Sequence, residues 1–186
     1  MHNLWTIDRL CTGLMILFLW ISNVDHAMIN ENQIKFLERS IEVARQGMLT
    51  GKGGPFGCII VQGQDIIAEG CNLVTSTNDP TAHAEVVAIR EACKKLDTYQ
   101  LTGCEVYASC EPCPMCLGAI YWARAKMVIY ANNRHDAAAI DFDDNFIYKE
   151  INTSDTAKQI PFIHHPLPSA KELFDQWVTA ANKRKY

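Results

Sequence analysis

The spacing of hydrophobic positions predicts alternating helices and strands from residue 30 onward. Apolar side chains three or four residues apart predict a first helix that begins at Asn30. The residues expected on its buried face are Ile34, Leu37, Ile41, Ala44 and Met48. Two apolar runs follow, at 56–61 and 65–70, and the glycine between them predicts that they form a β-hairpin.

The middle of the chain continues this alternation. Residues 72–80 are rich in Asn, Thr and Ser and predict a loop. Alanines at four-residue spacing then predict a helix over 80–96, with a small-residue face that packs closely on a sheet. Apolar runs at 105–109 and 126–131 predict two further strands, and a proline in a first turn favours a helix over 113–124 between them.

The C-terminal third is more polar and less regular. Residues 136–148 are mixed and acidic, 153–159 predicts a loop, and the prolines of 161–168 predict an extended segment before a last helix over 170–183. The order of elements predicts an α/β domain over residues 28–186. We expect a three-layer α/β/α sandwich with one mixed central sheet.

Residues 1–27 form an apolar N-terminal extension unlike the rest of the chain. The run from Leu10 to Ile21 is shorter than the roughly 20 residues that a membrane span takes, and it has the length of a signal-peptide core. Asp8 lies beside Arg9, the only arginine of residues 1–27, so this segment has little positive charge. Asp25 stands where signal cleavage would need a small neutral residue. We therefore favour an upstream start assigned in error, with the domain beginning at Met28, over a signal or anchor.

Composition narrows the function classes. With 186 residues, 48% hydrophobic and 20% charged, the chain is expected to bury a core as one ordinary domain. A net charge of −4 argues against a large nucleic-acid surface, for which a basic domain is expected. Most of the eight cysteines lie in apolar runs or at metal-ligand spacing, so they do not predict disulfides. We expect Cys58, Cys71, Cys93 and Cys104 to be small buried residues.

Two short motifs carry the candidate chemistry. The first, TAHAE, contains His83 and Glu85, and the second, EPCPMC, contains Cys113 and Cys116. One imidazole and two thiolates would give zinc three protein ligands and leave a fourth position for water, which is typical of a catalytic site. A zinc ribbon would need a second, non-overlapping C-x-x-C, and the sequence has none. The pattern H-x-E followed by P-C-x-x-C is the signature of zinc-dependent base deaminases.

This chemistry assigns a role to each motif residue. Both motifs fall where the predicted helices begin, and the free backbone N–H groups at a helix start favour thiolates. Zinc would lower the pKa of a bound water toward ~7, and Glu85 would accept the proton as zinc-bound hydroxide attacks a carbon that bears an amino group. Glu85 would then pass the proton to the ring nitrogen and to departing ammonia.

Longer stretches around the motifs narrow the assignment. They are GGPFG at 53–57, NDPTAHAE at 78–85, SCEPCPMCLGAIYWA at 109–123, FDDNFIYKE at 142–150, and NKRKY at the C-terminus. With these stretches the chain resembles the cytidine-deaminase-like superfamily, and within it the small bacterial guanine deaminases. The resemblance covers residues 28–186. It implies the cytidine-deaminase-like fold, one zinc ion per subunit held by His83, Cys113 and Cys116, and conversion of guanine and water to xanthine and ammonia, a step of purine catabolism.

The same resemblance implies a purine pocket. The substrate contacts carried over from the family are Phe56, Asn72, Ala84, Trp122, Asp144 and Tyr186. Phe56 would stack on the base, Asn72 would bond its edge, Trp122 would form a wall, and the Asp144 carboxylate would accept N–H groups of guanine. Asp143 is the rival for this last role. The family also implies a domain-swapped homodimer, in which the C-terminal arm, 161–186, covers the partner's site.

More than one function is compatible with these motifs. A tRNA adenosine deaminase, which converts adenosine to inosine, carries the same zinc motifs, but the acidic residues of 136–144 would repel an RNA backbone. A cytosine or nucleoside deaminase of the same fold, or a non-catalytic zinc protein, would also be compatible with them. We expect a free purine base as partner, no nucleic acid, no membrane for 28–186 and a cytoplasmic location. Residues 1–27 leave a secreted or anchored form open.

Overall fold

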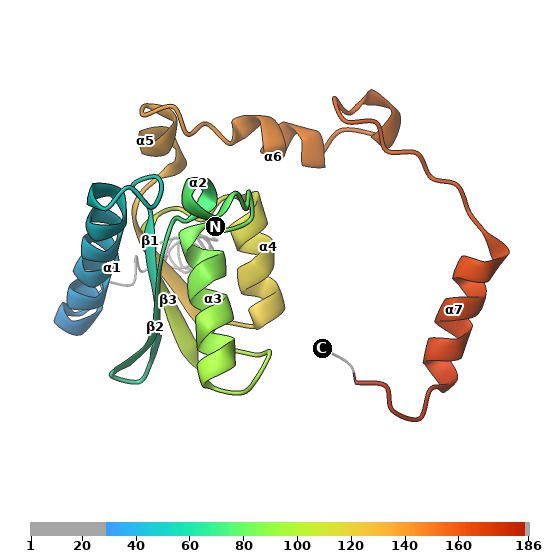
Figure 1. The fold of residues 1–186 in the computed structure, drawn as a ribbon, viewed down its shortest axis with the longest axis horizontal. Coiled ribbons are helices and arrows are strands. Elements are labelled where there is room, and N and C mark those ends of the chain that lie inside the picture. Colours follow the sequence, from blue (N-terminus) through green and yellow to red (C-terminus); the bar gives the residue numbers. More distant parts are fainter. Residues whose placement is uncertain (1–28, 185–186) are drawn as a thin grey trace, which may run out of the picture.

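The computed structural model describes residues 29–184 (Figure 1). The predictions for residues 1–27 and for Tyr186 fall outside the described residues. Within 29–184 the chain forms a compact α/β core, and a long C-terminal arm extends away from it.

The core is built on a four-stranded mixed sheet with the order β2-β1-β3-β4. The strands are β1 (Gly57–Gln62), β2 (Asp65–Cys71), β3 (Cys104–Cys110) and β4 (Met127–Asn132). The first two form the predicted hairpin, β1 pairs antiparallel with β3, and β3 pairs parallel with β4. Because β3 and β4 run in the same direction, their C-terminal ends meet at one edge of the sheet, where the second motif follows β3.

Helix α1 (Glu31–Leu49) covers one face of this sheet, and the Asn30 side chain caps it by accepting from the Gln33 backbone N–H. The predicted buried face was only partly right. The buried residues of α1 are Ser40, Val43, Ala44 and Gly47. Ile34 and Met48, which were expected inside, are exposed. The helix packs against β1 and β3 through small residues, so its contact face is rotated from the one that hydrophobicity suggested.

Helices α3 (Ala84–Lys95) and α4 (Pro114–Ala123) cover the other face, which confirms the three-layer α/β/α architecture. Along β1, side chains alternate between the two layers: Cys58 and Ile60 pack under α3 and α4, while Ile59 and Val61 pack under α1. The approach of α3 is close. A Cβ placed on Gly70 would lie 2.3 Å from the Ala84 carbonyl oxygen, so the first turn of α3 is held tightly against β2.

Several element boundaries differ from the predictions. The segment 72–80 is not wholly a loop, because the one-turn helix α2 (Val74–Thr77) lies within it. Helix α3 begins at Ala84 rather than near residue 80, with His83 as its extended N-cap. Among the described cysteines all thiols are free; Cys58 and Cys104 are buried as expected, and Cys71 and Cys93 are half-buried.

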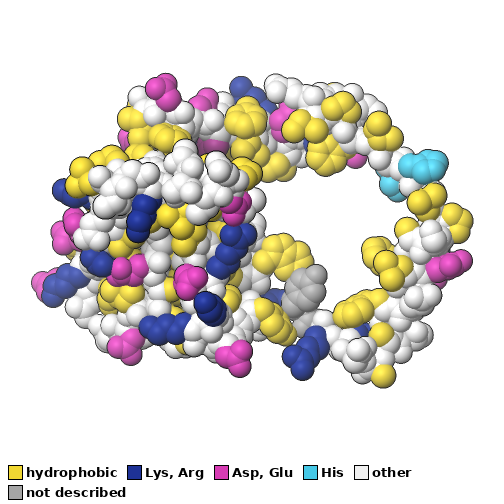
Figure 2. Space-filling model, viewed as in Figure 1, with side chains coloured by type: hydrophobic (Ala, Val, Ile, Leu, Met, Phe, Trp, Pro, Cys, Tyr) yellow, Lys and Arg dark blue, Asp and Glu magenta, His cyan; other side chains and the backbone are white. Residues whose placement is uncertain are grey.

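Beyond β4 the chain leaves the core. Short helices α5 (Arg134–Ala138) and α6 (Asn145–Ile151) cross the end of the sheet, and the 3-10 turn η1 (Asp155–Ala157) and helix α7 (Pro168–Thr179) follow. Helix α7 stands apart from the core, with open space between them (Figure 2). None of its residues is buried, and Phe174 is 73% exposed. In the described part of the chain no helix combines the length and apolar character needed to cross a membrane.

Candidate metal centre and its cavity

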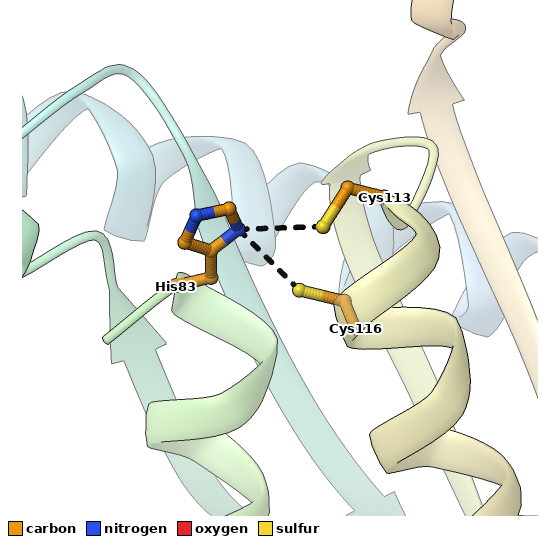
Figure 3. Close-up of side chains that lie close together, drawn as sticks. All are labelled: His83, Cys113 and Cys116. Atoms are coloured by element: carbon orange, nitrogen blue, oxygen red, sulfur yellow. Dashed lines mark hydrogen bonds between the residues drawn. The ribbon is translucent and has the colours of Figure 1, made fainter. Parts of the chain in front are cut away.

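The two sequence motifs meet at the N-terminal ends of α3 and α4 (Figure 3). His83 is the N-cap of α3 and Cys113 is the N-cap of α4, both with extended backbone, and Pro114 occupies the first turn of α4. At these positions the first backbone N–H groups of each helix have no partner within the helix and favour negative charge. Extended N-cap backbone also lets side chains two or three residues apart converge, as the motif chemistry requires.

His83, Cys113 and Cys116 form a group of ligand atoms that fits zinc. The Nδ1 atom of His83 lies 3.5 Å from the Sγ atom of Cys113 and 3.5 Å from that of Cys116. Tetrahedral zinc with ordinary Zn–N and Zn–S bonds of about 2.0–2.3 Å would place these nitrogen and sulfur atoms about 3.5 Å apart. All three ligand atoms lie within 4.8 Å of one another. The geometry therefore matches a three-ligand zinc site with room for a fourth ligand.

The two thiols differ in how readily they ionise. The Cys116 thiol beside it and the nearby His83 lower the pKa of Cys113 to about 4. The same proximity acts in the opposite direction on Cys116, whose pKa is raised by the Cys113 sulfur and by burial. Without a positive ion, only one sulfur of the pair readily ionises. A zinc ion would stabilise both thiolates at once, because metal ligation competes with protons for sulfur.

Glu85 is buried next to this group. Its Oε2 atom accepts from the Cys116 thiol at 3.3 Å, and its side chain lines the same cavity as His83 and Cys113. Burial raises the pKa of Glu85, an effect that the neighbouring Cys113 reinforces and His83 opposes. A carboxylate that is costly to keep charged, held beside a metal site, is suited to accept and release a proton.

A cavity of about 410 Å³ opens in front of the metal ligands. Phe56 and Phe142 form an aromatic wall, with ring centroids 4.9 Å apart and an edge-to-face angle of 88°. Gly54 lies against this wall, and a Cβ added there would approach the Cζ atom of Phe142 to 3.0 Å. The volume and the two rings suit a flat aromatic ligand.

Asn72 and Asp144 supply polar groups to the cavity. The Oδ1 atom of buried Asn72 accepts from the backbone N–H groups of Val74 at 3.2 Å and Gly54 at 3.4 Å, which leaves the amide NH₂ as the group to offer a ligand. Asp144 is half-buried at the N-cap of α6, and burial together with the nearby Cys113 raises its pKa. Asp143 instead accepts from the Asn145 backbone N–H at 2.9 Å, which ties it to the turn.

Three of the predicted substrate contacts are not found in this cavity. Ala84 is buried at the start of α3, where its carbonyl faces Gly70. Trp122 is 66% exposed and lines a separate apolar hollow between α3 and α4. Tyr186 lies outside the described residues. The roles expected for these three residues stay predictions.

Several residues that line the cavity have no distinct signal in the sequence. Phe142 and Glu111 lie in the stretches that carry the family resemblance, but the resemblance gave neither of them a role. Arg134 lies outside every motif. Phe142 and Arg134 reach the cavity because the chain turns back over the end of the sheet after β4. A turn of this kind leaves no periodic signal in the sequence, although the N-cap Asn133 with Asp136 three residues later does mark the start of α5.

Comparisons with known proteins agree with this geometry. The family model for the cytidine and deoxycytidylate deaminase zinc-binding region matches residues 30–132. The guanine deaminase of Bacillus subtilis is 55% identical over 155 residues, which cover 83% of this chain and 99% of that protein. Its crystal structure superimposes with a TM-score of 0.81 over 85% of this chain and 99% of that one. A tRNA-specific adenosine deaminase of Aquifex aeolicus is 34% identical over 145 residues, which cover 76% of this chain and 91% of that protein.

Proposed function

The chain belongs to the cytidine and deoxycytidylate deaminase zinc-binding family, and we propose that it is a guanine deaminase that converts guanine and water to xanthine and ammonia. The observation that carries the choice of base is the half-buried carboxylate of Asp144 in the cavity of the metal ligands. Guanine presents N–H donors at N1 and at its 2-amino group, and an ionised carboxylate only accepts. Adenine has a lone pair at N1, so it would leave Asp144 facing another acceptor, a mismatch that such sites reject strongly.

Each side chain of the site has a place in this reaction. Zinc held by His83, Cys113 and Cys116 would supply an activated water, because zinc lowers the pKa of bound water to ~7. Glu85 would take the first proton of the attacking water and deliver it to the ring nitrogen, and would then carry the second proton of that oxygen to the amino group, which leaves as ammonia. Phe56 stacks on the base, and the Asn72 amide donates to an acceptor on its edge. Each of these groups is carried by a core element or by the turns next to it, so the site is largely preorganised.

A polynucleotide substrate is disfavoured by the charge of the cavity. Its carboxylates are Glu85, Glu111, Asp141, Asp143 and Asp144. Among the described residues that line it, Arg134 is the only lysine or arginine. Phosphate groups are bound through Lys and Arg, and a ring of carboxylates repels them. The Aquifex aeolicus relative that acts on tRNA also matches at lower identity than the guanine deaminase, 34% against 55%.

A direct comparison of substrates tests the proposal. The purified 28–186 protein is offered guanine and, separately, tRNA with an adenosine at the wobble position, and xanthine and inosine are quantified. We expect xanthine with stoichiometric ammonia and no inosine above the level of a protein-free control. Inosine in the tRNA without xanthine would overturn the proposal in favour of a tRNA adenosine deaminase.

The arm supports a homodimer with exchanged C-terminal segments. Large apolar side chains along it are left open to solvent, among them Phe162, Ile163, Leu167, Phe174 and Trp177. Exposed apolar surface on this scale marks an interaction surface, and a second copy of the chain that exchanges the same segment would cover it. In such a dimer the arm of one subunit would close the site of the other and deliver Tyr186 to it. The two thiolate ligands also suit a reducing compartment, so we place the protein in the cytoplasm.

Deletion of Tyr186 tests the proposed closure. We expect the truncated protein to keep its melting temperature and zinc content but to lose about 5- to 13-fold in kcat/KM for guanine, because one hydrogen bond at a closed site contributes ~1–1.5 kcal/mol. Substitution of Tyr130, an exposed tyrosine on β4, by phenylalanine serves as the matched control. Wild-type kinetics in the truncation would remove Tyr186 from the site.

A further inference from the structure

The loop of the second motif is fixed to the point where α5 begins. The Glu111 backbone N–H donates to the Asn132 carbonyl at 2.8 Å, and the Arg134 backbone N–H donates to the Glu111 carboxylate Oε2 at 3.0 Å. Cys110 and Asn132 are also register partners in the β3–β4 pair. These bonds set the backbone of Arg134 at a defined place relative to the metal ligand Cys113, two residues after Glu111.

From this fixed place the Arg134 side chain reaches α6. Its guanidinium carbon lies 5.0 Å from the ring centroid of Tyr148, within the range of a cation–π contact. Tyr148 is four residues after Asp144, so both lie on one side of the α6 turn that begins at Asp144. The positive charge of Arg134 also opposes the repulsion that Glu111 and Cys113 exert on the Asp144 carboxylate.

Helix α6 relies on a few contacts with other described residues, among them the Gln159 backbone N–H, which donates to the Glu150 carboxylate at 2.9 Å. It has seven residues, none of them buried, and helices this short depend on contacts outside themselves. The Phe56–Phe142 contact anchors the chain just before α6, and the Arg134–Tyr148 contact is made by the helix itself. The direction in which the Asp144 side chain faces therefore depends more on the contact of Arg134 with Tyr148 than on the intrinsic helix propensity of α6.

We propose that Arg134 is a positioning residue for base recognition, which holds α6 through Tyr148 so that Asp144 faces the metal ligands. This inference deepens the proposed guanine deaminase function and rests on it. Arg134 acts on the binding of the base rather than on the proton transfers of Glu85. Its loss is therefore expected in KM and in the affinity for purine analogues, with a small effect on kcat.

The test uses Arg134→Met, which keeps much of the length of the side chain but removes the charged, planar guanidinium group. We expect KM for guanine and Kd for 8-azaguanine to rise about 5- to 30-fold, the range that corresponds to one partly desolvated cation–π contact, with kcat within about threefold of wild type. The matched control is Lys149→Met, which removes a positive charge from the same helix. We expect the control to keep wild-type values.

Tyr148→Leu and two double variants separate positioning from general destabilisation. Because the contact is mutual, Tyr148→Leu should raise KM as Arg134→Met does, and the Arg134→Met/Tyr148→Leu protein should be no worse than either alone. In an Asp144→Asn background, Arg134→Met should have no further effect on KM. Equal losses in kcat and KM, additive effects with Tyr148→Leu, or a full effect without Asp144 would each overturn the inference. A wild-type protein without guanine turnover would instead overturn the proposed function itself.

Discussion

Replacing Glu85 by glutamine is expected to lower kcat for guanine by about 10²–10⁴-fold, the contribution of a positioned general acid–base group, while zinc stays bound. Glutamine has the shape of glutamate and can still contact the Cys116 sulfur, which in the wild type lies 3.3 Å from the Glu85 Oε2 atom. An amide cannot take up the proton that the reaction must move. Steady-state ammonia release and the zinc content of the purified protein measure the two effects separately.

Glu91→Gln is the matched control for this prediction, because Glu91 is exposed on the same helix, α3. We expect it to behave as wild type in turnover, metal content and thermal melting. Wild-type turnover in Glu85→Gln would remove Glu85 from the mechanism. Loss of zinc together with turnover would assign Glu85 to the assembly of the metal site instead.

Asp144→Asn has the second largest expected effect, a loss of about 100-fold or more in kcat/KM for guanine. The substitution turns an acceptor into a group that presents N–H donors to the N–H donors of guanine, so charge-assisted hydrogen bonds are lost and a polar mismatch remains. The matched control is Asp143→Asn, because Asp143 accepts from the Asn145 backbone and belongs to the turn. A larger loss in Asp143→Asn than in Asp144→Asn would exchange the roles of the two residues.

The pH dependence of Kd for 8-azaguanine in the Glu85→Gln protein gives a second measure of Asp144, because it reports binding of the base without the protonation of Glu85. Burial raises the pKa of this carboxyl above that of an ordinary aspartate, the charge of Glu111 adds to the shift, and Arg134 partly opposes it. Recognition needs the ionised form, so guanine binding is present above this raised pKa and is lost as the pH falls through it. The decline on the acid side should therefore begin at a higher pH than the pKa of an exposed aspartate would give.

The metal centre could be predicted from the sequence because its chemistry is encoded in short spacings. Two thiolates three residues apart and a histidine with a glutamate two positions later define the ligand types and the proton shuttle. The structure then brings the histidine nitrogen to 3.5 Å from both sulfurs, which the sequence could not specify. The extended N-cap backbone of His83 and Cys113, which allows this convergence, was anticipated only as a requirement.

The buried face of α1 shows where hydrophobic spacing fails. Close packing on the sheet needs small residues at the points of nearest approach: a Cβ on Gly57 would lie 2.2 Å from the Ser40 carbonyl oxygen, and one on Gly47 would lie 2.6 Å from the Cβ of Cys71. Ser40 and Gly47 are therefore buried although neither is hydrophobic, and Met48 is displaced to the surface. Packing distance determined the orientation of this helix more than hydrophobicity did.

The cavity wall contributed by the segment after β4 could not be predicted from the sequence for a different reason. Phe142 and Arg134 are separated from Phe56 and Glu111 by long stretches of chain, and only the return of the chain over the sheet edge brings them together. Nothing in the local sequence of this mixed, acidic segment distinguishes a residue that turns inward from one that stays in solvent. The family resemblance supplied Asp144 at this place, while Arg134 is identified by its contacts alone.

The most direct test of the central claim is ammonia release by the purified 28–186 protein, with guanine, adenine, cytosine and cytidine offered separately. Each substrate is measured before zinc is removed by a chelator, after its removal, and after zinc is added back. The account predicts turnover of guanine alone, lost with the metal and restored with it. Turnover of another base in preference to guanine, or guanine turnover that survives complete removal of zinc, would contradict it.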